Sequence, residues 1–173
     1  MLNSYAETSE SSAQYKFVES TLSAVDRSKT PWVFVLFHCP FYNSDKDHQG
    51  EKQQIAMKKS MEPLFVKYRV NAAFSGHVHA YERSNNVAFE KYDSKAPIYI
   101  IVGDGGNREG HARGYVHHHS PDWSMFRDNT IFGFATLELL NNTHASFDWQ
   151  RNVDGGGLFA VHDSHVIENQ FFL

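Results

Sequence analysis

Apolar residues recur every three to four positions along residues 13–27, which is the spacing of one face of an α-helix. The side chains on that face are Tyr15, Val18, Leu22 and Val25. A second segment, 51–69, repeats the pattern, with Pro63 inside it. Because proline cannot donate the backbone hydrogen bond of a helix, Pro63 is expected to kink this helix or to start a new one.

Two continuous apolar runs flank the second predicted helix. WVFVLFH (32–38) and RVNAAFSG (69–76) are rich in β-branched and aromatic residues, a composition typical of strands buried on both faces. Each run leads directly into a polar loop. The first part of the chain is therefore predicted to alternate strand, helix and strand.

The pattern changes after about residue 95. Strand-like stretches now follow one another with short turns rich in Gly, Asn and Asp, at 96–106, 132–140, 144–152 and 158–167. We therefore expect an α/β (α+β) fold, in which residues 1–90 form an α/β half and residues 91–173 form a largely antiparallel, β-rich region of the same domain.

Composition and charge exclude two classes of partner. The net charge of −4 leaves no basic surface for nucleic acid or an anionic membrane, and no apolar run reaches the ~18 residues of a transmembrane helix. An anionic substrate would have to be held by a local site, with a metal as the leading candidate. Cys39 is the one cysteine, so no internal disulfide can form.

Histidines stand at the ends of both apolar runs. His38 ends the first, and Gly76-His77-Val78-His79 ends the second. In open α/β sheets, sites gather at the carboxyl ends of the strands, and imidazole is the commonest metal ligand. A surface His-Xaa-His turn and a hydrogen-bonded core histidine are the alternative interpretations. A third, an amidohydrolase-type barrel that also uses His-Xaa-His, would require repeated strand–helix units after the motif.

Four segments together resemble purple acid phosphatases, which belong to the calcineurin-like metallophosphoesterases. They are VFVLFHCPFYNS with HQGE, EPLFVKYRVNAAFSGHVHAYERS, APIYIIVGDGGN and THASFDWQRNVDG, and their order and spacing match the family over most of residues 1–155. The resemblance implies the C-terminal portion of a two-sheet sandwich with flanking helices.

The resemblance also implies a reaction and roles for four histidines. The family hydrolyses phosphate monoesters with Fe(III) and a divalent metal (Zn, Mn or Fe). By motif match, His38 and His77 would bind the divalent ion and His79 the Fe(III). His48 matches a histidine that contacts the phosphate and protonates the leaving group.

Two departures from the family pattern stand out. Asp47 occupies a position that is histidine in plant relatives, where its charge would repel the phosphate or raise the pKa of His48. The family's remaining ligands, two aspartates, a tyrosine and an asparagine, belong to motifs that precede the segment beginning at Met1. The alternative to a phosphatase is therefore a non-catalytic fragment that binds metal weakly or pairs with another copy as a homodimer.

Cellular location is not predicted for this chain itself. Residues 1–12 lack the basic start and apolar stretch of a secretory signal. The resemblance implies a secreted, vacuolar or lysosomal full-length protein, in which Asn141-Asn142-Thr143 would be a glycosylation sequon.

Overall fold

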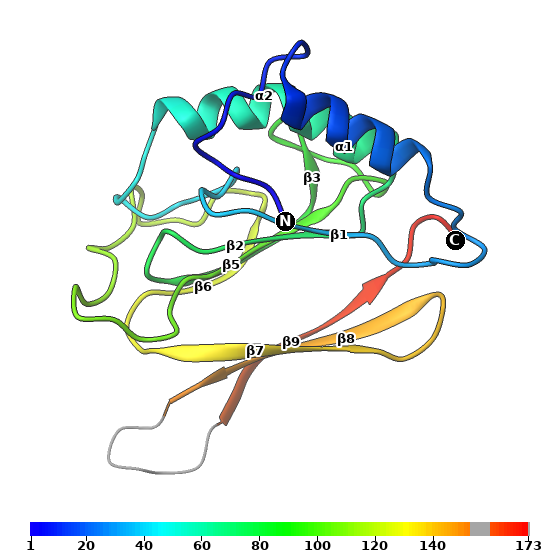
Figure 1. Ribbon diagram of the computed structural model, residues 1–173. Helices are drawn as coiled ribbons and strands as arrows, with labels where there is room; N and C mark the ends of the chain where they lie inside the picture. Colours follow the sequence, from blue (N-terminus) through cyan, green and yellow to red (C-terminus); the bar gives the residue numbers. More distant parts are fainter. Residues whose placement is uncertain (153–159, 173) are drawn as a thin grey trace.

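The computed structural model describes residues 1–152 and 160–172 and arranges them in three layers (Figure 1). Two helices, α1 (Ala13–Ser23) and α2 (Lys52–Lys67), cover one face of a mixed sheet, and a second sheet packs against the other face. The predicted two-sheet sandwich with flanking helices is confirmed. Neither helix is long and apolar enough to cross a bilayer, a finding that extends to the described residues alone.

The first sheet has the order β1-β2-β5-β3-β4, with β6 paired to β3. Its strands are β1 (Phe34–Leu36), β2 (Ala72–Ser75), β3 (Tyr81–Ala88), β4 (Lys91–Tyr92), β5 (Ile98–Val102) and β6 (Ser124–Asp128). β1, β2 and β5 run parallel, so the carboxyl ends of β1 and β2 meet at one edge. The first two strands that begin after residue 92, β5 and β6, also belong to this sheet.

The second sheet is antiparallel, with the order β7-β8-β9. Its strands are β7 (Gly133–Leu139), β8 (His144–Arg151) and β9 (Ala160–Glu168). The expected strand at 158–167 begins outside the described residues. Positions 153–155 of the last family-like segment also lie outside them. Two stacked sheets do not form a barrel, so the amidohydrolase alternative is wrong.

Three expectations about individual elements were wrong. Helix α1 ends at Ser23 instead of 27, because Asp26 accepts hydrogen bonds from the amide and hydroxyl of Ser28 and closes a turn. The apolar run 32–38 contributes only three residues to β1, and Leu36 is 42% exposed because β1 is the edge strand. Of the two outcomes expected at Pro63, the new helix is wrong, since α2 continues through Pro63 as one element.

Two apolar cores hold the layers together. The first lies between the helices and the first sheet, where Met57, Met61 and Phe65 of α2 are fully buried. The second lies between the sheets, where the rings of Tyr81 and Trp149 stack with centroids 4.5 Å apart. These cores place the helices and the second sheet on opposite sides of the strand ends that carry the histidines.

Two buried asparagines tie the start of the first sheet to the end of the second. Asn71 donates to the side-chain oxygen of Asn169, 2.8 Å away. Asn169 in turn donates to the carbonyls of Pro31 and Asn142. The side-chain oxygen of Asn71 accepts from the amide of Val33. Loops that are distant in sequence thus share one hydrogen-bond network.

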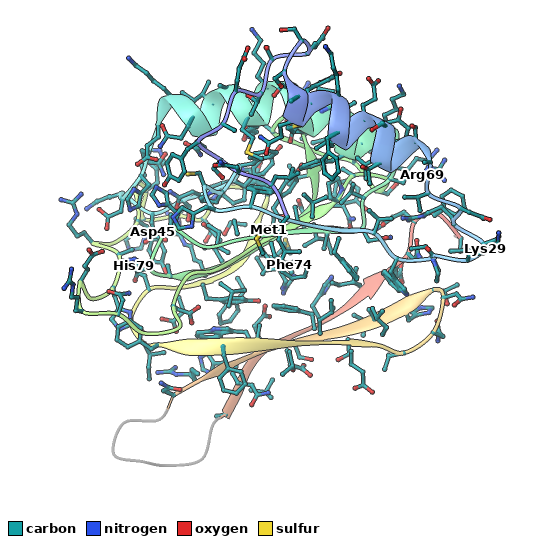
Figure 2. The ribbon with its side chains drawn as sticks, in the orientation of Figure 1. Met1, Lys29, Asp45, Arg69, Phe74 and His79 are labelled. Carbon is teal, nitrogen blue, oxygen red and sulfur yellow. The ribbon has the colours of Figure 1, made fainter. Side chains whose placement is uncertain are left out.

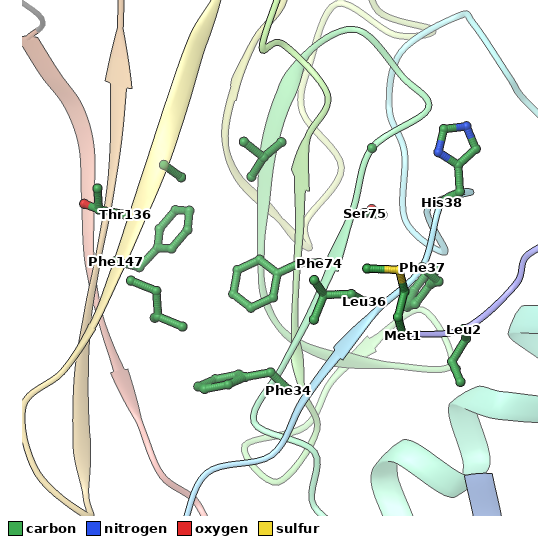
Figure 3. A pocket seen from close by; sticks show the side chains of 14 residues that line it. Met1, Leu2, Phe34, Leu36, Phe37, His38, Phe74, Ser75, Thr136 and Phe147 are labelled. Carbon is green, nitrogen blue, oxygen red and sulfur yellow. The ribbon is translucent and has the colours of Figure 1, made fainter. Parts of the chain in front are cut away.

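An apolar groove opens between the edge strands of the two sheets (Figures 2 and 3). It has a volume of about 630 Å³ and reaches from Phe34 and Phe74 of the first sheet to Leu137 of the second, with His38 at its rim. Figure 3 shows the rings of Phe34, Phe74 and Phe147 directed into this space. The sandwich is therefore open beside β1, which is the edge strand of the first sheet within residues 1–152 and 160–172.

Candidate metal and phosphate site

His38 and His77 meet at the shared edge of β1 and β2. The amide of Gly76 donates to the carbonyl of His38, which joins the two strand ends. The Nε2 atom of His38 lies 3.0 Å from the Nδ1 atom of His77. Partial desolvation, and then the neighbouring His77 and His48, lower the pKa of His38. His38 is therefore neutral, the form that binds metal, down to a lower pH than an ordinary histidine.

The backbone of His77 explains why the two histidines of the His-Xaa-His motif diverge. His77 has φ +67, a left-handed conformation that is uncommon for a residue other than glycine. In an extended backbone, His77 and His79 would project to the same side. Here His77 turns toward His38, while His79 turns toward a different loop. Strained backbone of this kind gathers at functional sites.

Glu51 joins His77 to His48, and this role was not predicted from the sequence. One carboxylate oxygen lies 2.8 Å from Nδ1 of His48, and the other lies 3.0 Å from Nε2 of His77. Burial raises the pKa of Glu51, but hydrogen bonds from His48 and His77 outweigh it and hold the pKa below its ordinary value. Glu51 is thus a carboxylate that orients both imidazoles. Its position immediately before α2, close behind His48, was the signal available in the sequence.

The rings of His48 and His77 lie in contact, with centroids 3.7 Å apart and planes tilted by 38°. The structure therefore brings together three of the four predicted site residues: His38, His77 and His48. The backbone of His48 has φ +60, which again lies in the left-handed region, and this conformation directs the His48 side chain back toward the strand ends.

His79 faces the glycine-rich segment 103–110 instead of the other histidines. Its Nδ1 atom lies 3.1 Å from the carbonyl oxygen of Gly110, and its Nε2 atom lies 3.9 Å from Glu109. A donor at Nδ1 leaves Nε2 as the atom available to a metal. The segment itself is tied to the second sheet, since Nε1 of Trp149 donates to Asp104 over 2.7 Å.

Asp47 is paired with Arg113, a partner that its position in the sequence did not reveal. Its two oxygens accept from the backbone amide and from Nε of Arg113. Burial raises the pKa of Asp47, yet the hydrogen bonds and charge of Arg113 hold it below its ordinary value. Arg113 compensates the carboxylate, which therefore fastens the His48 loop to the segment around residue 113.

Asp45 anchors the same loop from inside. It is fully buried and accepts from Asn129, while its other carboxylate oxygen has no partner in the described part of the chain. Burial raises the pKa of Asp45 to about 6, with the nearby Glu82 adding to the rise and Asn129 opposing it. Above that pH the fold contains a buried charge.

This burial predicts a pH dependence of stability. Because the pKa of Asp45 is raised on folding, its stabilising contribution is complete below about pH 4 and is lost as the pH rises through about 6. Asp45→Asn should therefore raise the free energy of unfolding by about 2 kcal/mol at pH 7 and by little at pH 4. Urea unfolding at both pH values measures the difference. The exposed Asp122→Asn is the matched control, and an equal effect of Asp45→Asn at both pH values would contradict the assignment.

The residues present fit part of a metal centre. Two nitrogen ligands of one tetrahedral zinc ion lie about 3.3 Å apart, given bonds of about 2.0–2.1 Å. The 3.0 Å between His38 Nε2 and His77 Nδ1 matches this spacing. Glu51 on the opposite nitrogen of His77 is the carboxylate–histidine arrangement that orients metal ligands. The described residues place no carboxylate between this pair and His79, so a bridge between two ions would have to come from elsewhere.

The fold and the histidines at its strand ends define a metallophosphoesterase. Residues 1–81 match the family described as "Calcineurin-like phosphoesterase", and residues 96–164 match "Iron/zinc purple acid phosphatase-like protein C". The chain belongs to the purple acid phosphatase family, as its sequence motifs predicted.

Individual relatives with similar sequence or structure are also named purple acid phosphatases. "Probable purple acid phosphatase 20" of Arabidopsis thaliana is 47% identical over 154 residues, which cover 89% of this chain and 36% of the relative. "Fe(3+)-Zn(2+) purple acid phosphatase 12" of the same plant is 43% identical over 170 residues, covering 92% of this chain and 35% of the relative. The solved purple acid phosphatase PPD1 from yellow lupin (Lupinus luteus) seeds superposes with a TM-score of 0.82 at 27% identity, covering 96% of this chain and 30% of that one.

This chain thus spans little more than a third of the length of the relatives it matches. The name of the second relative contains the metal pair that the sequence resemblance implied, Fe(III) with a divalent ion.

Proposed function

We propose that this chain supplies part of the metal site and the leaving-group histidine of an acid phosphatase that hydrolyses phosphate monoesters. The observation that carries the proposal is the approach of His38 Nε2 to His77 Nδ1 at 3.0 Å, with Glu51 on the far nitrogen of His77. Membership of the purple acid phosphatase family supports it.

Three histidines would hold the metals. His38 and His77 would bind the divalent ion (Zn, Mn or Fe), and His79 would bind Fe(III) through Nε2. When bound, such a pair neutralises the charge of the phosphate and polarises its oxygens. The separate contacts of His77 and His79 support this division, because each imidazole has one nitrogen bound to a protein oxygen, while its other nitrogen faces a different group, His38 for His77 and Glu109 for His79.

His48 acts on the substrate in this proposal. Its Nδ1 atom is held by Glu51, so its Nε2 atom is the one able to deliver a proton to the leaving oxygen. Asp47 takes no part, because it is paired with Arg113.

The missing ligands, including the bridging aspartate, are proposed to come from polypeptide outside these residues. The groove beside β1 supports this, since it is apolar, about 630 Å³ in volume and open next to His38. A further strand pairing with β1 would cover the groove and bring new side chains to the metal side. The alternative function is a non-catalytic fragment that binds a single ion, and the incomplete ligand set is the observation on which this alternative rests.

The decisive experiment compares this chain alone with the same chain joined to the preceding segment of "Probable purple acid phosphatase 20". We expect the joined protein to bind two metals and to hydrolyse aryl and alkyl phosphates at acidic pH. We expect the chain alone to be colourless, to bind at most one divalent ion and to show little activity. Metal analysis, a visible spectrum and a phosphate-release assay measure all three properties.

His48→Ala in the joined protein tests the role of the imidazole within that experiment. Turnover of an alkyl phosphate should fall about 100-fold, with a smaller loss for an aryl phosphate, whose better leaving group needs less protonation. Metal content should not change. Equal losses on both substrates would assign His48 to phosphate binding instead. A joined protein that binds two metals but releases no phosphate would contradict the proposed function.

A further inference from the structure

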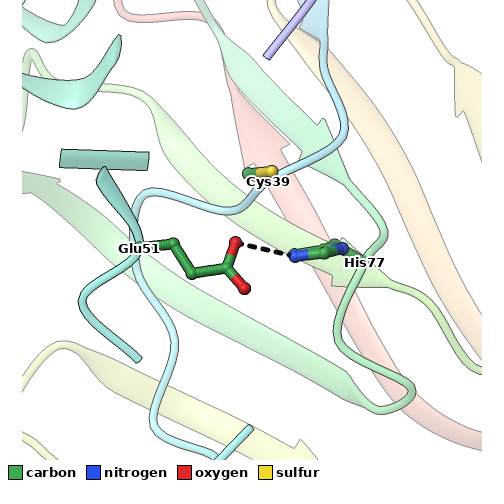
Figure 4. A group of neighbouring side chains, drawn as sticks. All are labelled: Cys39, Glu51 and His77. Carbon is green, nitrogen blue, oxygen red and sulfur yellow. Dashed lines mark hydrogen bonds and ion pairs between the residues drawn. The ribbon is translucent and has the colours of Figure 1, made fainter. Parts of the chain in front are cut away.

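Cys39, Glu51 and His77 bring three different metal-binding atoms together beside the histidine pair (Figure 4). The sulfur of Cys39, a carboxylate oxygen of Glu51 and a ring nitrogen of His77 all lie within 4.8 Å of one another. Over residues 1–152 and 160–172, no other three His, Cys, Asp or Glu side chains share such a spacing. Thiolate, imidazole and carboxylate are the donors that bind zinc in proteins.

We propose that these three side chains form a mononuclear site for Zn²⁺ or another borderline-soft divalent ion. Its ligands are Cys39 Sγ, Glu51 Oε2 and His77 Nε2, with water in the fourth position. The site lies on the Nε2 side of His77, whereas His38 approaches from the Nδ1 side. It is therefore distinct from the metal position assigned to the two imidazoles, and it does not rest on the proposed phosphatase function.

Two of the three donors already have the required spacing. His77 Nε2 and Glu51 Oε2 are 3.0 Å apart, close to the about 3.3 Å between two light-atom ligands of one tetrahedral zinc ion. An ion at this position replaces the proton that now joins the imidazole to the carboxylate. The sulfur then has to approach from at most 4.8 Å to about 3.6 Å, which a small rotation of the Cys39 side chain provides.

The surrounding structure holds Cys39 in place for this role. Cys39 is 1% exposed, and its amide and that of His38 both donate to the hydroxyl of Ser4, at 2.9 and 3.0 Å. Because Cys39 is the only cysteine of the chain, no disulfide within it competes for the sulfur. Glu51 precedes α2 without capping it through its side chain, and its Oε2 atom accepts one further hydrogen bond, from Nε2 of Gln53, which a bound ion would replace.

Occupation of this site has a consequence for His48. Glu51 at present holds both His48 and His77, and a metal on Oε2 and on His77 Nε2 takes over part of that role. Zinc bound here would therefore compete with His48 for Glu51 and weaken the contact that orients the His48 ring.

The experiment is X-ray absorption at the zinc edge on the full 173-residue chain loaded with one equivalent of Zn²⁺. We expect one sulfur at about 2.3 Å, with nitrogen and oxygen ligands at about 2.0–2.2 Å. Loading with Co²⁺ should give a thiolate-to-cobalt charge-transfer band in the near ultraviolet. Zinc or cobalt bound without a sulfur ligand would overturn the proposal.

Matched variants separate this site from its neighbours. Cys39→Ser should remove the charge-transfer band and weaken metal binding at least about tenfold, and Glu51→Gln should keep the band but weaken binding by a similar factor. His38→Gln should retain both the band and the affinity, because it removes only the Nδ1-side partner. Replacing the exposed histidines 117–119 by alanine excludes adventitious binding there. Loss of binding in His38→Gln with full binding in Cys39→Ser would also overturn the proposal, and the wild-type spectra decide the matter even if a variant fails to fold.

Discussion

Asp163→Ala is expected to lower the free energy of unfolding by about 4 kcal/mol. Asp163 of β9 accepts two hydrogen bonds from the guanidinium of Arg83 on β3, at 2.7 and 2.9 Å, and a third from the hydroxyl of Tyr81. Arg83 and Asp163 are each 8% exposed. Removing the carboxylate would leave the guanidinium buried between the two sheets without a partner, and that unpaired charge is the source of the loss.

The control is the double variant Arg83→Met with Asp163→Leu. A buried ion pair replaced by apolar side chains of similar size is often nearly neutral, so the double variant should recover most of the lost stability. Urea unfolding of the three proteins at pH 7 measures both effects. A loss below about 1 kcal/mol in Asp163→Ala would show that the guanidinium remains solvated and that the pair does not join the sheets.

The same pair has a defined response to acid. Burial raises the pKa of Asp163, but the hydrogen bonds and charge of Arg83 hold it below its ordinary value. Its stabilising contribution is therefore present above about pH 4 and lost as the pH falls through the lowered pKa. The direction is opposite to that of Asp45, whose contribution is lost as the pH rises.

Gly103→Ala should destabilise the fold by about 3 kcal/mol or more and disturb the His77–His79 loop at the same time. A Cβ atom at position 103 would lie 1.8 Å from the carbonyl oxygen of Val78, the residue between the two histidines. That oxygen belongs to the backbone and cannot rotate away. The end of β5 and the histidine loop would have to separate, and the hydrogen bond from the Gly103 amide to the carbonyl of Ala80 would be lost.

Gly105→Ala provides the matched control for this substitution. It lies in the same segment, and a Cβ atom there meets nothing within 4 Å. Its free energy of unfolding should change by less than about 0.5 kcal/mol. Thermal or urea unfolding distinguishes the two variants, and the nuclear magnetic resonance signals of His77 and His79 report the loop. Two variants of equal stability would show that the strand end has room that the structure does not reveal.

The sequence predicted the parts of the site that depend on local order. Strands rich in apolar residues, each followed by histidine, indicated where β1 and β2 end, and parallel pairing then placed His38 beside His77. The pattern could not reveal Glu51 as the partner of two histidines, because that contact joins the start of α2 to a strand end 26 residues away. Nor could it show that Arg113 neutralises Asp47, across a separation of 66 residues.

The local sequence pattern also could not predict which strands are neighbours in the sheets or which strand lies at an edge. Residues 32–38 have the composition of a strand buried on both faces, yet Leu36 is exposed, because β1 is the last strand of its sheet in the described residues and only the amide of Leu2 is bonded to Leu36 there. The stretch at 96–106 was expected to belong with the antiparallel half, but β5 lies beside β2 and runs parallel to it. The composition of a strand indicates how much apolar surface it can bury. Which elements pack against that surface depends on the fold of the whole chain.

The two asparagines that connect the sheets determine how the molecule would respond to tension. Asn169 follows β9 directly and is bonded through its side chain to Asn71, which immediately precedes β2, and to the carbonyls of Pro31 and Asn142. A pull on the C-terminal end would therefore load β2, the neighbour of the edge strand β1, before β9 can separate from β8. The end of β9 is thus held by side-chain hydrogen bonds. A tether attached there would strain the first sheet, whose strands β1 and β2 lead to His38 and His77.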